Sequence, residues 1–314
     1  MTVMDAYVEP HLKWRLLTAE DLQAAETFRA QLEALDNSVL AGMIATIVAD
    51  LQPAPGLAVG GWDGYDSLSA VGAAFIADTD PPRLYLIGGV HPVHRHMLIG
   101  THLLKWQVAS AEAWRDRTAP GQKLWLGCYA EVGRPGLAGV AARQGFTPER
   151  FYYDLHRDLA RPLSVPSVDG VTVEPFRPGD AEAVRLLHNR CFTLIGGTEV
   201  GADEWHAHLA EPTFRHEWSF VARQDGELIG YELSVAEDRD GSLGWTERFG
   251  VHPDHRGRGV SLALLGAGLQ AMQDSGCTEA GIGVDTPDGL ALTRLRSELG
   301  YSLRDAVALL SRVV

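Results

Sequence analysis

The chain has 314 residues, enough for two domains, and its 46% hydrophobic and 22% charged residues are ordinary for a globular protein. The formal net charge of −14 opposes a general nucleic-acid or anionic-membrane surface, because such partners bind basic patches. Cys128, Cys191 and Cys277 are widely spaced and form no Cys-x-x-Cys, so neither a disulfide framework nor a structural zinc site is indicated. We expect each cysteine to be a small buried hydrophobic residue.

The sequence shows no recognisable targeting or membrane-spanning segment. The N-terminus has no basic start followed by an apolar core, and no later stretch approaches about 20 uninterrupted apolar residues. We therefore expect a cytoplasmic protein with no membrane partner.

Hydrophobic periodicity predicts the elements of the first half of the chain. Thr18-Ala19-Glu20-Asp21 is typical of a helix cap, so a helix should begin at Leu22. Around it we expect a strand over residues 13–17, a second helix over 38–49, an antiparallel meander over 57–62, 68–76 and 84–90, a helix over 101–115, a strand over 124–129 and a short helix over 137–143.

The second half repeats this order after a candidate linker, residues 161–167, which contains two prolines and two serines. Val90-x-Pro92 recurs 161 residues later and Gly145-Phe146 recurs as Gly300-Tyr301 155 residues later, which indicates one duplicated unit with a small insertion or deletion. The predicted domains are 1–160 and 168–314. The second should contain strands over 171–176, 219–223 and 228–236, a central strand to 251 and a strand over 280–284, with helices over 180–191, 203–209, 262–274 and 290–299.

The central strand of the second half leads into a turn and then a helix. The strand should end at Val251, because Pro253 lacks an N–H donor and fixes φ. Gly257 and Gly259 permit positive φ just before the apolar helix, so that successive N–H groups point outward beside the positive end of the helix dipole. The sequence therefore predicts a phosphate-binding turn, supplemented by Arg256 and Arg258. Taken alone, the same pattern fits a tight turn with solvated arginines equally well.

The wider pattern, Val-x-Pro-x-x-Arg-Gly-x-Gly-x-Ser before an apolar helix, resembles the acyl-coenzyme A signature of the GNAT N-acetyltransferases. Arg256, Gly259 and Ser261 fit that signature, with serine in place of the usual final small residue. Because both halves resemble the family in element order, the resemblance covers nearly the whole chain. It implies an α/β (α+β) fold of two tandem GNAT domains, each a mixed, mostly antiparallel sheet flanked by helices, with acetyl-CoA or another acyl-CoA as co-substrate and no metal.

The resemblance also implies where the coenzyme binds in the second half. In GNAT folds the central strand splays from the following one, here residues 280–284, and the pantetheine arm inserts between them. A backbone N–H on the central strand would polarise the thioester carbonyl, as an oxyanion donor does. The coenzyme-binding residues implied are Phe249, Gly250 and Val251 on the strand and Arg256, Gly257, Arg258, Gly259, Val260 and Ser261 in the loop.

Glu247 is the acidic residue of the central strand and the candidate general base, which would take a proton from the attacking amine directly or through water. By the period of two it should share a face with Trp245, Phe249 and Val251. A solvated surface carboxylate is an equally weighted interpretation. Family members often place a catalytic glutamate where Trp245 stands here.

Two further candidates lie near the last helix. Many GNAT enzymes have a tyrosine there that protonates the leaving thiolate, whereas Arg296 occupies that position in Leu-Arg-x-x-Leu-Gly-Tyr. Arginine stays protonated and is a poor general acid, although it could stabilise a thiolate or a phosphate. The general acid is therefore unassigned. Asp288 matches the family's Asn-x-x-Ala opening of this helix against the coenzyme, but a helix cap is the favoured role.

The loop of the first half differs from that of the second at the two glycine positions. His96 and Leu98 stand where Gly257 and Gly259 stand in the second half, and Ala141 is at the place equivalent to Arg296. We expect side chains in the loop to disfavour positive φ and to block close approach of a diphosphate. The first half should then act as a scaffold or as a wall of the substrate cleft, although an altered nucleotide site there is not excluded by the sequence.

The expected activity is transfer of an acetyl group to the primary amine of a small molecule. A substrate rim could be formed by Glu199, Asp203 and Glu204, although a solvated acidic loop is the favoured interpretation. A metal site at His206 and His208 is not favoured, because residues two apart on a helix face different directions. The alternatives are another donor, such as a longer acyl-CoA or an aminoacyl-tRNA, or a non-catalytic acyl-CoA-binding protein. The acceptor, for instance a mycothiol precursor, an aminoglycoside or an amino acid, and the oligomeric state stay open.

Overall fold

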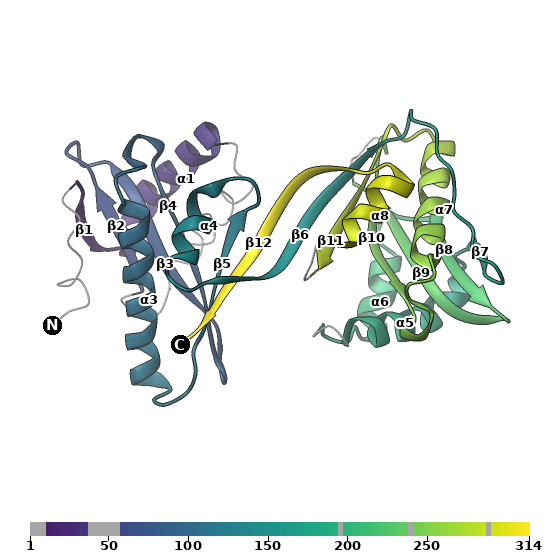
Figure 1. The fold of residues 1–314 in the computed structure, drawn as a ribbon, viewed down its shortest axis with the longest axis horizontal. Coiled ribbons are helices and arrows are strands. Elements are labelled where there is room, and N and C mark those ends of the chain that lie inside the picture. The colour runs from purple at the N-terminus through teal and green to yellow at the C-terminus, as the bar shows by residue number, and fades with distance from the viewer. Residues whose placement is uncertain (1–10, 37–56, 194–196, 238–240, 287–289) are drawn as a thin grey trace. The chain divides into compact units, whose positions relative to one another are not determined.

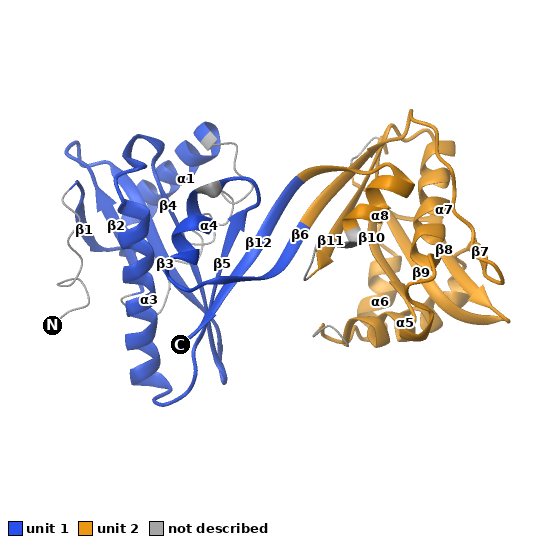
Figure 2. Cartoon of the chain, viewed as in Figure 1, with its two compact units in different colours: residues 1–152, 305–314 blue, residues 153–304 orange. Residues whose placement is uncertain are grey.

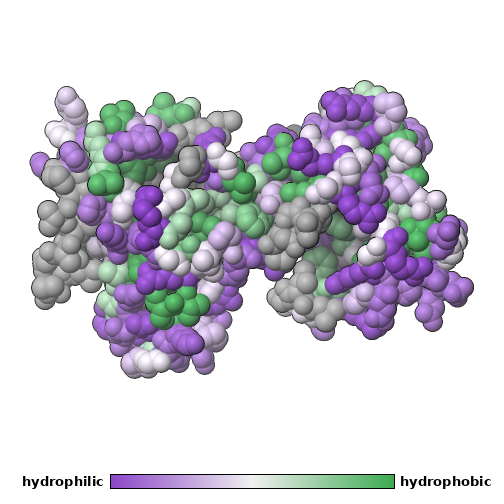
Figure 3. Space-filling model, viewed as in Figure 1, coloured by the Kyte–Doolittle hydropathy of each residue, from purple (hydrophilic) through white to green (hydrophobic). Residues whose placement is uncertain are grey.

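The computed structural model describes residues 11–36, 57–193, 197–237, 241–286 and 290–314 (Figure 1). The chain divides into two compact units, residues 1–152 with 305–314 and residues 153–304 (Figure 2). The predicted helix over 38–49 lies outside the described residues. Hydrophilic residues alternate with smaller hydrophobic patches on the visible face (Figure 3), and none of the described helices is long and apolar enough to cross a membrane.

Unit 1 is built on a mixed sheet with the strand order β1-β2-β3-β4-β5-β12. All of its registered strand pairs are antiparallel except β4 with β5, which is parallel. Helix α1 covers one face and α3 the other. The elements are β1 Lys13–Leu16, α1 Leu22–Asp36, β2 Ala58–Trp62, β3 Leu68–Thr79, β4 Pro82–Val90, α3 Ile99–Thr118, β5 Trp125–Glu131 and α4 Pro135–Ala142, with the end of β12 Ser302–Val313.

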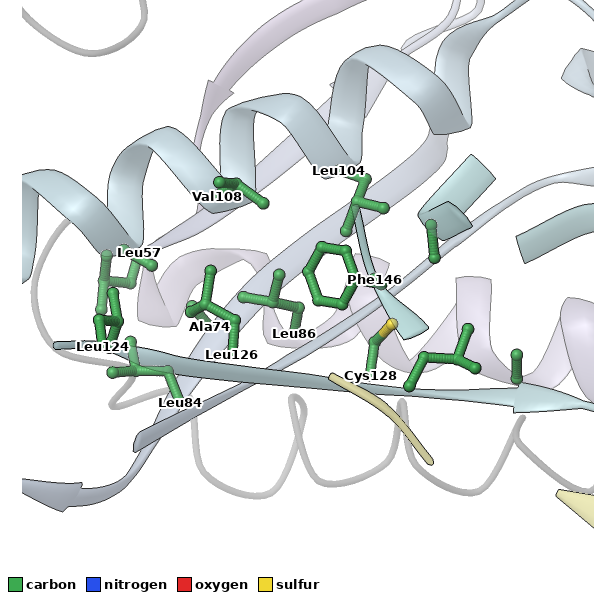
Figure 4. Close-up of a cluster of buried hydrophobic side chains, with 14 of the residues drawn as sticks. Leu57, Ala74, Leu84, Leu86, Leu104, Val108, Leu124, Leu126, Cys128 and Phe146 are labelled. Carbon is green, nitrogen blue, oxygen red and sulfur yellow. The ribbon is translucent and has the colours of Figure 1, made fainter. Parts of the chain in front are cut away.

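The core of unit 1 is formed by hydrophobic side chains that alternate along its strands. Leu84 and Leu86 of β4 and Leu126 of β5 project toward α3, where they meet Leu104 and Val108 (Figure 4). The opposite face of the sheet packs against α1 through a second buried cluster. Burying both faces requires helices on both sides, which gives the layered arrangement that the sequence predicted.

Unit 2 repeats this plan with the strand order β6-β11-β10-β9-β8-β7 and parallel pairing of β10 with β11. Helices α5 and α6 pack on one face, and α7 and α8 on the other. The elements are β6 Thr147–Asp158, β7 Thr172–Pro175, α5 Ala181–Thr193, α6 Ala202–Leu209, β8 Phe214–Gln224, β9 Glu227–Ala236, β10 Leu243–Val251, α7 Val260–Asp274, β11 Glu279–Thr286 and α8 Leu290–Leu299.

Two long strands were missed by the sequence analysis. β6 and β12 follow the short helices α4 and α8, where no further strand was predicted, and each continues from one unit into the other. The end of β12 pairs with β5, from Val307 opposite Glu131 to Val313 opposite Trp125, so residues 305–314 belong to unit 1. The predicted second domain ran to residue 314 because strand exchange leaves no local signal in the sequence.

One carboxyl group lies inside the core of unit 2. Glu232 of β9 is fully buried, and its Oε1 accepts hydrogen bonds from the hydroxyls of Ser234 and, at 3.1 Å, Thr246. Its Oε2 has no hydrogen-bond partner among the described residues. Burial raises the pKa of Glu232 to about 8, so that the folded protein holds this group protonated at neutral pH.

This raised pKa makes stability depend on pH. Between the ordinary glutamate pKa and about 8, the unfolded chain releases the proton that the folded chain keeps, so stability falls as pH rises through that window. Glu232→Gln stays neutral and should gain on the order of 3–5 kcal/mol relative to wild type between pH 5 and pH 8. Chemical denaturation at both pH values measures this. The exposed Glu227→Gln on the same strand is the control, and a pH-independent difference for Glu232→Gln would contradict the assignment.

Candidate active site

The centre of unit 2 is the point where two parallel strands part. β10 pairs with β11 from Leu243 opposite Glu279 to Thr246 opposite Ile282. The registered pairing ends there, although β10 continues to Val251 and β11 to Thr286. A β-bulge on the other side of β10, between Thr246 and Arg248 against β9, coincides with this point. The splay that the family resemblance implied is therefore present.

Beyond the splay, one edge of β10 has backbone groups that β9 does not use. His252 N–H donates to Ile229 O at 2.8 Å, so by antiparallel alternation Gly250 also faces β9. Phe249 and Val251 consequently direct their N–H and C=O groups toward β11. These are the backbone groups expected to hold a pantetheine arm and to polarise a thioester.

Gly250 itself has no room for a side chain. A Cβ there would lie 2.8 Å from the Tyr231 ring and 3.3 Å from the Cys191 sulfur. The Tyr231 hydroxyl shares a 2.7 Å hydrogen bond with His188 Nδ1, and burial lowers the pKa of His188 to about 4. A neutral, hydrogen-bonded layer thus supports this strand from the α5 side. All three cysteines are buried, as predicted.

The predicted phosphate-binding turn has the expected backbone. After a 3-10 turn over Pro253–His255, Gly257 and Gly259 adopt φ of 75° and 93°. Gly259 caps α7, and its carbonyl accepts from Leu262 and Ala263, which leaves the first N–H groups of the helix pointing outward. Val260 is 1% exposed, and its side chain packs in a core cluster with Leu264 rather than toward a ligand.

Side chains brace this loop. Arg256 Nε donates to Val251 O at 3.1 Å and ties the loop to the end of β10. Arg258 Nη1 donates to Gln224 Oε1 at 3.0 Å and lies 3.3 Å from His255 Nδ1. Both arginines are exposed, Arg256 directly before Gly257 and Arg258 between the two glycines, so both belong to the turn where a diphosphate would bind.

Glu247 is partnered by a residue that sequence reasoning missed. Its Oε2 lies 3.1 Å from Nε2 of His208, which α6 contributes and which packs beside Trp205 and Phe214. This close contact with His208 lowers the pKa of Glu247 against the opposing effect of burial. Glu247 is therefore a part-buried, ionised carboxylate rather than a freely solvated one. The sequence analysis weighed His208 only as a metal ligand. The observation that could have identified it is that family members use this segment as the substrate rim.

The bulge corrects the predicted face of Glu247. Glu247 and Arg248 both project to the side of α5 and α6, where Arg248 lies 5.6 Å above the Trp205 ring. Trp245 packs on this same side, as predicted, whereas Phe249 and Val251 pack into clusters formed with α7. Strict alternation fails at this position because the extra residue changes the phase of the strand.

The remaining predicted residues lie on or near α8. Arg296 is exposed and lines an open pocket of about 570 Å³ together with Arg161 and Tyr301. No described contact joins it to the loop. Asp288 lies outside the described residues, and Ser261 is half-buried in the first turn of α7.

Unit 1 keeps the backbone of this site. β4 pairs with β5 only from Arg83 opposite Trp125 to Tyr85 opposite Gly127, and β4 then continues to Val90. Arg95 Nε donates to Val90 O at 3.0 Å, as Arg256 does to Val251 in unit 2.

The unit 1 loop adopts the left-handed backbone although it has no glycine at these two positions. His96 and Leu98 both adopt φ of 63°, close to the values of the equivalent glycines in unit 2. The duplicated framework holds these residues in the left-handed region although their side chains disfavour it. Leu98 is 65% exposed, so its side chain still stands over the face of the loop where a diphosphate would approach.

Comparisons with known proteins agree with this geometry. Residues 181–301 match the model of the acetyltransferase (GNAT) family. The mycothiol acetyltransferase of Thermobispora bispora is 32% identical over 247 residues, which cover 76% of this chain and 78% of the relative. A GCN5-related N-acetyltransferase structure from Sphaerobacter thermophilus has a TM-score of 0.66 at 20% identity and covers 98% and 96% of the two chains. A tandem GNAT protein from the clavulanic acid biosynthesis pathway has a TM-score of 0.55 at 17% identity and covers 96% and 98%.

The chain therefore belongs to the GNAT family and is an acyl-CoA-dependent N-acetyltransferase with two GNAT-fold units. Acetyl-CoA is the acyl donor that the family uses. Within the described residues, no group of three or more His, Cys, Asp or Glu side chains is arranged to hold a metal ion.

The strained loop of unit 1 makes a stability prediction. Leu98→Gly removes the left-handed strain of an exposed side chain and should stabilise the protein by about 0.5–1 kcal/mol after the added freedom of the unfolded chain is subtracted. Val93→Gly, in the same turn and 71% exposed, is the control and should destabilise. Chemical denaturation compares the two variants, and an equal loss of stability in both would refute the strain argument.

Proposed function

We propose that unit 2 transfers the acetyl group of acetyl-CoA to the primary amine of a small molecule by direct attack. The observation that carries this proposal is the splay of β10 from β11 leading directly into a two-glycine loop at the start of α7. The loop would bind the diphosphate through N–H groups and through Arg256 and Arg258. The pantetheine arm would lie along the edge of β10 at Phe249 and Val251, where the Val251 carbonyl already accepts from Arg256 Nε.

In the proposed reaction, the amine nitrogen attacks the thioester carbonyl carbon. An N–H of Phe249 or Val251 stabilises the developing oxyanion, and the carbon–sulfur bond breaks to release the coenzyme A thiolate. The proton lost from nitrogen passes to the Glu247 carboxylate, directly or through one water molecule. Holding both substrates in one cleft contributes much of the remaining acceleration.

His208 acts in this proposal as the positioning residue for Glu247. It lies 3.1 Å from the carboxylate, is 9% exposed at its side chain and is fixed by aromatic neighbours on α6 and β8. A fixed imidazole beside the carboxylate keeps it ionised and holds its position. Arg296 replaces the family tyrosine, so the thiolate is left for solvent to protonate in this scheme.

The amine that accepts the acetyl group is proposed from the names of the relatives. Relatives carry the name mycothiol acetyltransferase, so the amine of a mycothiol precursor is the first acceptor to test. This chain has Trp245 at the family's base position and Arg296 at its acid position, so other amines belong in the same screen.

The first experiment is calorimetric titration of acetyl-CoA. Wild type should bind at one site per chain, and Gly259→Asp should weaken binding at least about 100-fold, because the carboxylate repels the diphosphate. Gly259→Ala imposes the same backbone strain without the charge and separates the two effects. Leu98→Asp is the matched control at the equivalent position of unit 1 and should bind as wild type does.

Two results would contradict this arrangement. Two sites per chain, or loss of binding in Leu98→Asp, would show that unit 1 holds the coenzyme. No binding by wild type would exclude acetyl-CoA as the donor.

A second experiment tests the base. Glu247→Gln should lower kcat/KM at pH 7 by about 10²–10⁴ with KM for acetyl-CoA unchanged, and His208→Gln should lower it less. The deficit of Glu247→Gln should shrink as pH rises toward 10, because the free amine then needs no base. The exposed Glu217→Gln is the control. An unchanged kcat/KM in Glu247→Gln would eliminate it as the base.

A further inference from the structure

An arginine far from the loop in sequence lies beside it in space. Arg294 is on α8, and its Nη2 is 3.8 Å from the position that a Cβ on Gly259 would occupy. Gly259 is the residue that begins α7 and whose positive φ opens the loop. The Arg294 guanidinium therefore flanks the predicted diphosphate position from the α8 side, while Arg256 and Arg258 flank it within the loop.

The orientation of Arg294 is set by Glu298, one turn further along the same helix. Nε donates to Glu298 Oε1 at 2.7 Å and Nη2 donates to Oε2 at 3.3 Å. This two-point contact fixes the plane of the guanidinium. In the described part of the chain Nη1 makes no hydrogen bond, and half of the side chain is exposed, so donors are available to a ligand.

Arg256 and Arg258 each already use one N–H donor in a hydrogen bond within the protein. Arg256 uses Nε on Val251 O, and Arg258 uses Nη1 on Gln224. On a chain of net charge −14, a third oriented cation beside the loop raises the local positive potential where a dianionic diphosphate must bind. The equivalent position of unit 1, counted from the shared Gly145 and Gly300, is Gly139, so unit 1 has no counterpart.

We propose that Arg294 is a donor-binding residue that hydrogen-bonds the diphosphate of acetyl-CoA, held in place by Glu298. This inference rests on the proposed acetyl-CoA site of unit 2. It adds a residue from the last helix to a site that the loop sequence alone defines, and it gives α8 a part in donor selection that does not depend on Arg296.

The test compares three donors in wild type and Arg294→Gln. The donors are acetyl-CoA, acetyl-dephospho-CoA, which lacks the 3′-phosphate, and acetyl-pantetheine, which lacks the diphosphate. Arg294→Gln should weaken the first two by about tenfold each and leave the third unchanged, because only the first two carry the diphosphate. Binding is measured by calorimetry for the nucleotides and as kcat/KM for acetyl-pantetheine.

Arg29→Gln is the matched control, since Arg29 forms the same i,i+4 pair with Glu33 on α1 of unit 1. It should bind all three donors as wild type does, and chemical denaturation of both variants shows that folding is intact. Weakening of acetyl-CoA alone would assign Arg294 to the 3′-phosphate and overturn the proposal. Unchanged binding in Arg294→Gln would also overturn it while leaving the proposed function standing. No acetyl-CoA binding by wild type would refute both.

Discussion

The site depends on one interruption in backbone pairing. Parallel hydrogen bonding between β10 and β11 ends at Thr246 and Ile282, and the bulge at Glu247 falls immediately after it. The interruption turns Phe249 and Val251 away from β9, with the Val251 carbonyl accepting from Arg256 and Cys191. The bulge turns two consecutive side chains, Glu247 and Arg248, onto the face of α5 and α6. The backbone donors and the carboxylate that we propose for catalysis thus arise from the same local irregularity.

Comparing the two units separates the framework from the chemistry. Unit 1 keeps the parted strands, the bracing arginine and even the left-handed loop, which Leu98 occupies at a conformational cost. The irregularity of β4 against β3 lies elsewhere, between Ile76 and Asp78, while β3 and β4 stay in register from Ala70 to Ile76, and β4 carries no carboxylate. The fold therefore preserves the parted strands and the loop backbone in both copies, while the groups proposed for catalysis occur in unit 2.

Sequence patterns predicted the framework well because each feature was local. Pro253 fixes its own φ and Gly257 and Gly259 permit positive φ without strain, and the meander of β2, β3 and β4 follows from alternation. The features that were missed depend on distant partners. The bulge at Glu247 exists only relative to β9, His208 reaches Glu247 only after α6 docks, and β12 joins unit 1 by pairing with β5.

Trp245 shows how the site can depart from the family pattern and keep its proton chemistry. Its indole lies across Gly281, where a Cβ would come within 2.3 Å of the ring, and its edge faces His156 at 5.8 Å. That packing fills the position of the usual carboxylate with an apolar group. In the proposed mechanism proton acceptance moves two residues along β10 to Glu247, whose pKa the contact with His208 lowers. Compared with a carboxylate at position 245, one at position 247 would accept a proton from an amine bound at a different point along β10. We therefore expect the position of the base and the shape of the acceptor to change together.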